Sequence, residues 1–133
     1  MTFELPAQTA IYNRLNGAIS ATIYDDVPIQ PDGQPNANWP YVVVGDTTAA
    51  PWDTDDRTGA SMTVTLHIWS RYAGMSEAKS IAGQIYDRLH RHALAVTGMH
   101  TVDCLYEFST FMRDSDGETR HGVVRYRLTM QDA

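Results

Sequence analysis

The chain has 133 residues, 43% hydrophobic and 20% charged, and a formal net charge of −6. Its length is that of one domain, and this ordinary composition excludes a disordered, collagen-like or coiled-coil protein. The acidic balance opposes tight binding to a phosphate backbone, and a single cysteine, Cys104, excludes an intrachain disulfide. No apolar run reaches the roughly 20 residues of a membrane span, and the first residues lack a signal peptide's features, so we expect a cytosolic protein without membrane contact.

The first third of the chain predicts one helix and one long loop. Pro6 suits a first helical position, and Ile11, Leu15 and Ile19 share one helical face, which predicts a helix over 6–22. Prolines then recur up to residue 40, each removing a backbone donor. This pattern predicts a loop over 24–40.

A short strand and a second loop follow. The β-branched run YVVVG at 41–45 predicts an interior strand, and the polar run at 46–61 predicts another loop. Loops of this length are uncommon in compact domains unless they are functional or disordered. We therefore expect both loops to be extended or mobile and to contact something outside the subunit.

The clearest change of hydrophobic period lies within 62–90. Apolar residues alternate at Val64, Leu66 and Ile68, and then recur at helical spacing from Ala78 to Leu89. This pattern predicts a strand followed by an amphipathic helix.

Two alternating runs, 101–113 and 120–131, complete the chain. The Asp116–Gly117 dipeptide between them is a strong hairpin signal. The element order α-β-β-α-β-β predicts an α+β fold with two layers: a mostly antiparallel four-stranded sheet with two helices on one face. We expect a single domain over 1–133.

Alternation also predicts which strand residues face the helices. In the 101–113 run the helix-facing set is Val102, Cys104, Tyr106, Phe108 and Met112. Trp69, Leu105 and Phe111 then fall on the uncovered face. Exposed apolar patches of this kind mark protein contacts, so we expect oligomerisation through this face.

No constellation of residues predicts catalysis or a metal site. His90 and His92 are two positions apart at a helix end and point to different faces. The acidic loop beside Trp52 shows no sign of burial, and Gly117 comes too early for a calcium loop. We therefore predict no catalytic residue, no cofactor and no metal.

Charged residues allow two interpretations. Arg113, Arg125 and Arg127 lie on the final hairpin, where they could pair with acidic neighbours such as Glu107. Alternatively, this basic strip could meet the acidic loop of an identical neighbour in a ring. The candidate interface residues are Trp52, Asp53, Asp55, Asp56, His67, Trp69, Leu105, Phe111, Arg113, Arg125 and Arg127.

Three blocks carry a resemblance to a known family: PYVVVGDTT at 40–48, HIWSRYAGMSEAKSIAGQIYDRLH at 67–90 and FMRDSDGETRHGVVRYRL at 111–128. In their order they resemble the tail completion or tail-terminator family of long-tailed phages and phage-like gene transfer agents. The resemblance implies a structural subunit of a ring, typically hexameric, at the head-proximal end of the tail tube. Such a ring stops tube polymerisation and docks the head connector, and DNA passes through its lumen without sequence-specific binding.

The resemblance further implies assembly in the host cytoplasm and a final place at the tail–neck junction of the particle. Its implied partners are further copies of itself, the tail tube protein and the head connector or stopper protein. Other readings stay open at this point: a neck or stopper protein, a small ligand-binding α+β protein or enzyme, and a soluble dimer without a phage role.

Overall fold

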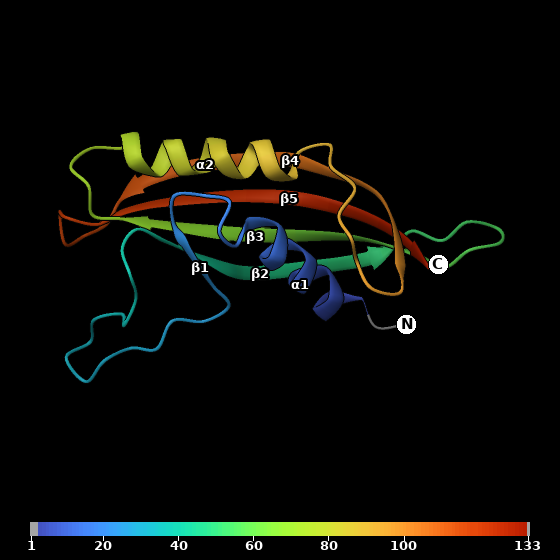
Figure 1. Cartoon of the computed structure of the whole chain (residues 1–133), viewed down its shortest axis with the longest axis horizontal. Coiled ribbons are helices and arrows are strands. Elements are labelled where there is room, and N and C mark those ends of the chain that lie inside the picture. The colour runs from blue at the N-terminus through green and yellow to red at the C-terminus, as the bar shows by residue number, and fades with distance from the viewer. Residues whose placement is uncertain (1–2, 133) are drawn as a thin grey trace.

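The computed structural model describes residues 3–132, apart from the side chain of Val102. Two helices and five strands follow one another along the chain (Figure 1). They are α1 (Glu4–Leu15), β1 (Thr22–Tyr24), β2 (Tyr41–Pro51), β3 (Gly59–Ser70), α2 (Ser76–Leu89), β4 (Met99–Arg113) and β5 (Arg120–Asp132). Neither helix in this described range is long and apolar enough to cross a membrane.

The strands form one mixed sheet in the order β1-β2-β3-β5-β4. Its strand pairs are antiparallel except for β1, which runs parallel to β2. The predicted α+β class and the two helices are confirmed, but the four-stranded sheet is wrong because β1 adds a fifth strand. The predicted helix over 6–22 ends at Leu15; Gly17 follows with a φ of +77°, and this backbone cannot continue a right-handed helix.

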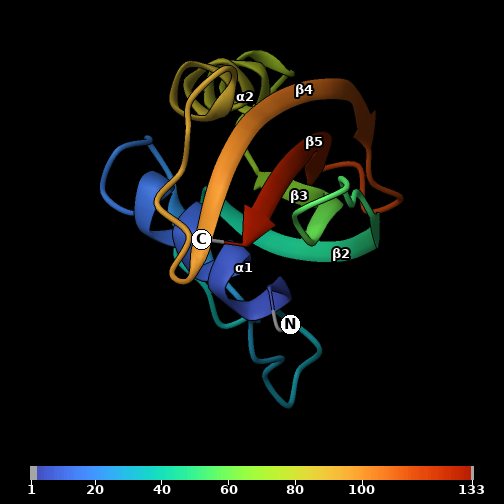
Figure 2. The same ribbon diagram turned by 90° about the vertical axis from the view of Figure 1, so that its right-hand side faces the viewer.

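Both helices cover the same face of the sheet. In α1 the buried residues are Ala7, Ala10, Ile11 and Leu15, and in α2 they are Ala78, Ile81, Ile85 and Leu89. These residues join the alternate positions of β3 and β5, among them Leu66 and Tyr126, in one hydrophobic core. The sheet is strongly curled, and β4 arches over it when the molecule is viewed from its end (Figure 2).

The connection from β3 through α2 to β4 joins two parallel strands, with β5 between them. Such crossovers are right-handed. Figure 1 views the sheet from the helix side, with β3 and β4 pointing one way and β2 and β5 the other. In the strand order of the sheet, β4 forms one long edge. The other edge is formed by β2, with the short β1 beside its first residues.

The second predicted loop is shorter than the expected range of 46–61. β2 continues to Pro51 and β3 already begins at Gly59, so only 52–58 connect them. The added part of β2 consists of Thr and Ala residues at 47–50, which pair with β3 after a register shift between Val44 and Thr47. A run without large apolar side chains can still be a strand where its backbone pairs with a neighbour.

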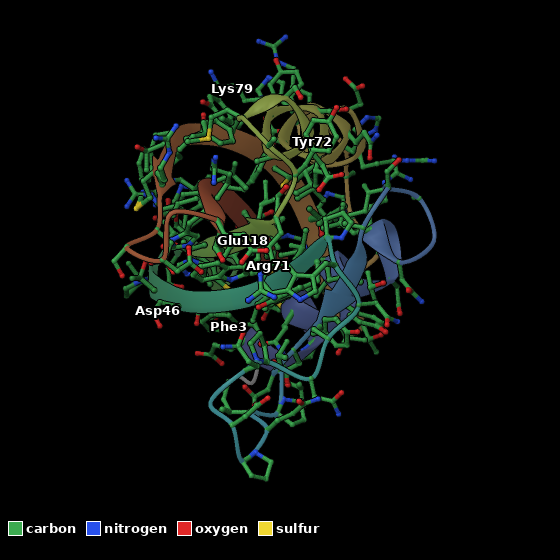
Figure 3. The ribbon with its side chains drawn as sticks, turned by 90° about the vertical axis from the view of Figure 1, so that its left-hand side faces the viewer. Phe3, Asp46, Arg71, Tyr72, Lys79 and Glu118 are labelled. Atoms are coloured by element: carbon green, nitrogen blue, oxygen red, sulfur yellow. The ribbon has the colours of Figure 1, made fainter. Side chains whose placement is uncertain are left out.

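The loop over 25–40 is tied to the end of β3 by Arg71. The guanidinium of Arg71 lies 4.1 Å from the ring centroid of Trp39 and donates to the side-chain oxygen of Gln34 at 2.8 Å. It also reaches the Thr119 hydroxyl at 3.5 Å. Figure 3 shows Arg71 at this end of the molecule, close to Glu118 of the β4–β5 hairpin.

Candidate functional site

The candidate site is the face of the sheet that the helices leave uncovered, which we call the open face. Its side chains alternate with the core positions and are half-buried or exposed. They include His67 and Trp69 on β3, His121, Arg125 and Arg127 on β5, and Leu105, Phe108 and Met112 on β4. Leu105, Phe108 and Met112 keep 37%, 38% and 42% of their surface exposed.

A bulge in β4 decides which side chains reach the open face. Tyr106 pairs with Tyr126 and Phe108 with Arg125, so Glu107 is an extra residue between two successive pairs. Beyond such a bulge the alternation reverses. The prediction that Phe108 and Met112 face the helices is therefore wrong, because both lie on the open face.

Phe111 is displaced to the helix side by the same bulge. Its ring packs against the core, and the ammonium of Lys79 on α2 lies 5.8 Å from the ring centroid. A Cβ added to Gly122 would come within 3.0 Å of this ring, so glycine leaves room for it. The prediction that Phe111 lies on the uncovered face is wrong, whereas Leu105 and Trp69 do lie there.

Two histidines and a tryptophan pack together at the hairpin end of the open face. Nδ1 of His67 and Nε2 of His121 lie 2.8 Å apart, so one imidazole donates to the other. The ring of Trp69 stacks on His121 with centroids 3.9 Å apart and planes 6° apart. Burial, followed by the nearby charge of His67, lowers the pKa of His121, against an opposing effect of Asp114.

Two arginines share one carboxylate in the middle of the open face. Nε of Arg125 and Nε of Arg127 lie 3.1 Å and 2.9 Å from the Glu107 oxygens. Arg125 also lies over the ring of Phe108 at 4.8 Å, and Arg127 donates to Ser61 Oγ at 2.8 Å. The pairing of Arg125 and Arg127 with an acidic neighbour thus occurs within the chain, and the three side chains retain one net positive charge.

The acidic loop lies at the far end of β2 and β3 from the β4–β5 hairpin (Figure 1). Trp52 is 39% exposed, and Asp53 accepts a hydrogen bond from the Gly59 amide at 2.9 Å. Asp56 accepts from the Thr54 hydroxyl, and Asp55 is exposed. Asp53 and Asp56 therefore shape the turn. Among the described residues, the loop forms no hydrogen bond or ion pair with Arg125 or Arg127.

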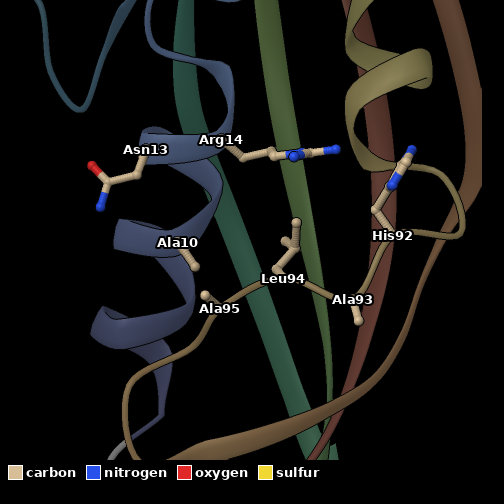
Figure 4. A pocket seen from close by; sticks show the side chains of 7 residues that line it. All are labelled: Ala10, Asn13, Arg14, His92, Ala93, Leu94 and Ala95. Atoms are coloured by element: carbon tan, nitrogen blue, oxygen red, sulfur yellow. The ribbon is translucent and has the colours of Figure 1, made fainter.

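The pocket between α1 and the segment after α2 does not gather catalytic groups among the described residues. The pocket in Figure 4 lies between α1 and residues 92–95, with small apolar side chains along much of its wall. Its polar groups serve the backbone: Arg14 donates to the Arg88 carbonyl at 2.8 Å, and Nε2 of His92 lies 3.0 Å from the Asp87 carbonyl. In the described part of the chain, no three His, Cys, Asp or Glu side chains group to hold a metal.

Shifted pKa values elsewhere have structural causes. Burial, with a smaller effect of Asp103, raises the pKa of Cys104 to about 12, so its thiol is not a nucleophile near neutral pH. Burial likewise raises the pKa of Tyr126. Hydrogen bonds, chiefly from the Thr119 hydroxyl, lower the pKa of Asp116 to about 2 and hold the hairpin turn.

Sequence reasoning missed Phe108, Met112 and His121 as members of the open face. For Phe108 and Met112 one signal was present: apolar residues at 104, 106, 108, 111 and 112 do not keep a single alternation. A broken alternation within one strand indicates a bulge. For His121 the signal lay in its register with Trp69, which depends on the long-range pairing of β5 with β3.

Comparisons with known proteins identify a family, a related sequence and a similar structure. The family model described as tail completion protein gp17 matches residues 5–131. The tail completion protein gp17 of Bacillus phage SPP1 is 29% identical over 94 residues, which cover 71% of this chain and 69% of that protein. A chain from the virion of a native gene transfer agent particle has a similar fold, with a TM-score of 0.78, 22% identity and 93% coverage of both chains. The chain therefore belongs to the tail completion protein gp17 family, a family of phage tail structural proteins.

Proposed function

We propose that this protein is a non-enzymatic virion subunit that forms a hexameric ring at the head-proximal end of a tail tube. The ring terminates tube polymerisation and joins the tail to the head connector or stopper protein. The family match over residues 5–131 carries this proposal, since it spans nearly the whole chain and names tail completion. The resemblance of the SPP1 protein supports it.

The surface supports assembly through unlike patches on neighbouring copies. The acidic loop around Trp52 and Asp55 is exposed at one end of the sheet, and the Arg125–Glu107–Arg127 cluster keeps one net positive charge. Contact between this loop and the cluster of the next copy is heterologous, and heterologous contacts form a ring when the rotation from copy to copy closes. His67, Trp69 and Leu105 add a partly apolar surface for neighbouring subunits or the tube.

The charge distribution suits the passage of DNA through a lumen. The chain has a net charge of −6, and the arginines of the open face are paired with Glu107. Tight binding to DNA needs unpaired cations that displace counterions from the phosphates. A ring of such subunits therefore lets DNA pass without holding it. The subunit is made in the host cytoplasm and ends at the tail–neck junction of the particle.

The test removes the protein from producing cells and examines the particles by electron microscopy. A missing terminator leaves tubes that continue to polymerise, so we expect overlong or headless tails. Complementation with the wild-type chain carrying a small label should restore tail length and place the label at the head-proximal end of the tail.

Two results would overturn the proposal. Heads that leak DNA beside tails of normal length would assign the protein to the neck, as a stopper. Particles of normal form without the protein would remove it from tail completion altogether. A label at the distal tip of the tail would contradict the proposed position.

A further inference from the structure

We infer that neighbouring copies join edge to edge, with residues 107–113 of β4 pairing antiparallel with residues 45–51 of β2 in the next copy. The sheets then run on from copy to copy around the ring, with the helices outside and the open face toward the lumen. This inference rests on the proposed ring and names its interface.

Each stretch is an uncovered part of a sheet edge that is covered elsewhere along its length. On β4, the amide of Tyr106 donates to Nδ1 of His90 at 3.0 Å and the Cys104 carbonyl accepts from Arg91 at 2.7 Å. Among the described residues, only β5 pairs with the backbone of 107–113. On β2, β1 covers residues 41–43, and residues 46–51 are all exposed. An uncovered edge strand is a template for pairing with another chain.

Side-chain size and charge fit this pairing. The β4 stretch carries the exposed Phe108 and Met112, whereas the β2 stretch carries only Thr and Ala at 47–50. Small side chains let large ones cover them across a strand pair. In the antiparallel orientation, Asp46 lies near the same end of the pairing as Arg113, one residue from the position opposite it. Both are exposed, and Asp46 lies on β2 at the periphery of the molecule (Figure 3).

The two stretches do not lie at the same level of one sheet. Through β5, Thr110 is level with His67 of β3, whereas Thr48 is level with Thr63. Pairing them therefore displaces the next copy along the strands by about four to six residues, an even number because faces must match. Closed barrels require such a stagger.

The size of the stagger agrees with barrel geometry. Four strands of each copy follow one another around the ring, because β1 lies beside residues 41–43 only and the next copy pairs with β2 itself. Four strands at roughly 4.8 Å span about 19 Å, whereas staggers of four and six residues at roughly 3.4 Å span about 14 Å and about 20 Å. The strands therefore tilt from the ring axis by about 35° or about 47°, and typical barrels have tilts of about 35–45°.

The direction of the stagger decides which face points inward. With β3 pointing up and the helices toward the viewer, β4 is the right edge and β2 the left (Figure 1). In a barrel of right-twisted strands seen from outside, the copy on the right is displaced upward. This displacement raises its 45–51 to the level of 107–113 only when the helices are outside. With the helices inside, the same twist moves the two stretches apart.

Paired cysteines test the interface in assembled particles. The double variants Thr48→Cys/Met112→Cys and Thr48→Cys/Thr110→Cys place thiols across the interface for staggers of six and four residues. The native Cys104 is buried, and Thr48 and Met112 lie near opposite edges of one sheet, so a new disulfide must join two copies. Thr48→Cys/Leu105→Cys is the matched control. Leu105 lies on the same strand and the same face as Thr110 and Met112, but too far along the strand to lie opposite Thr48.

After mild oxidation of purified particles, we expect one of the two test pairs to give a reducible ladder in multiples of 14.9 kDa, and the control to stay monomeric. Normal tail length under reducing conditions shows that each variant folds and assembles. A monomer from both test pairs, or a ladder from the control, in particles where the label marks a ring at the tail–neck junction would overturn the interface and leave the proposed function standing. A label elsewhere would overturn the proposed function itself.

Discussion

On the helix-covered face, Leu66 and Tyr126 have no exposed surface, whereas on the open face Leu105, Phe108 and Met112 keep more than a third of theirs. Both faces belong to the same strands, so local propensity does not separate them. What separates them is the cover of α1 and α2. The difference shows that apolar residues on the covered face hold the subunit together, and it supports the proposal that those on the open face contact other molecules.

The largest effect is expected from Leu66→Ala on the covered face. Truncating a fully buried leucine leaves a cavity, so the free energy of unfolding should fall by about 2–5 kcal/mol. Its neighbour Thr65 points to the open face, and Thr65→Ala should change stability by only about 0.5 kcal/mol. Denaturant unfolding of the purified chain measures both, and equal losses would remove the distinction between the faces.

A smaller but sharper contrast comes from two phenylalanines on one strand. Phe111 packs against the core beside Lys79, so Phe111→Ala should lower the free energy of unfolding by about 2 kcal/mol. Phe108 is exposed on the other face, and Phe108→Ala should cost less than about 1 kcal/mol. The reverse order in denaturant unfolding would mean that the bulge at Glu107 is misplaced.

The histidine pair predicts the smallest effect, a dependence of stability on pH. The pKa of His121 is lowered in the folded chain, so the unfolded chain binds a proton at higher pH. The contribution of His121 to the free energy of unfolding is therefore fully present at pH values above its unfolded-state pKa of about 6.5. It is lost as the pH falls through that value toward the lower pKa of the folded state. His121→Gln, which can still bond His67, should flatten the change in unfolding free energy between roughly pH 7.5 and 5.5. An unchanged slope would show that His121 does not contribute to the dependence of stability on pH.

The sequence was informative where a hydrophobic period lasts for several turns or residues. The alternation around Leu66 and the helical spacing from Ala78 to Leu89 predicted β3 and α2, and the Asp116–Gly117 turn predicted the final hairpin. β1 was missed because three residues carry too little pattern, and its pairing is with a strand far along the chain. Phe111 was assigned to the wrong face because one extra residue at Glu107 reverses all later positions.

The candidate site shows the same division. Trp69 and Leu105 could be placed on the open face by alternation alone, since no bulge separates them from the core positions beside them. The sharing of Glu107 by Arg125 and Arg127 depends on that bulge, and the stacking of Trp69 on His121 depends on the register of β5 against β3. Long-range register is set by tertiary contacts, which a single sequence does not display.

Arg71 has a mechanical consequence. Its side chain joins Trp39 and Gln34 of the loop over 25–40 to Thr119 of the β4–β5 hairpin, while its backbone continues directly from β3. A force applied to that loop is therefore carried into the central strand and the hairpin together rather than absorbed by the loop. At the proposed position between head and tail, this end of the molecule would respond to load as one unit.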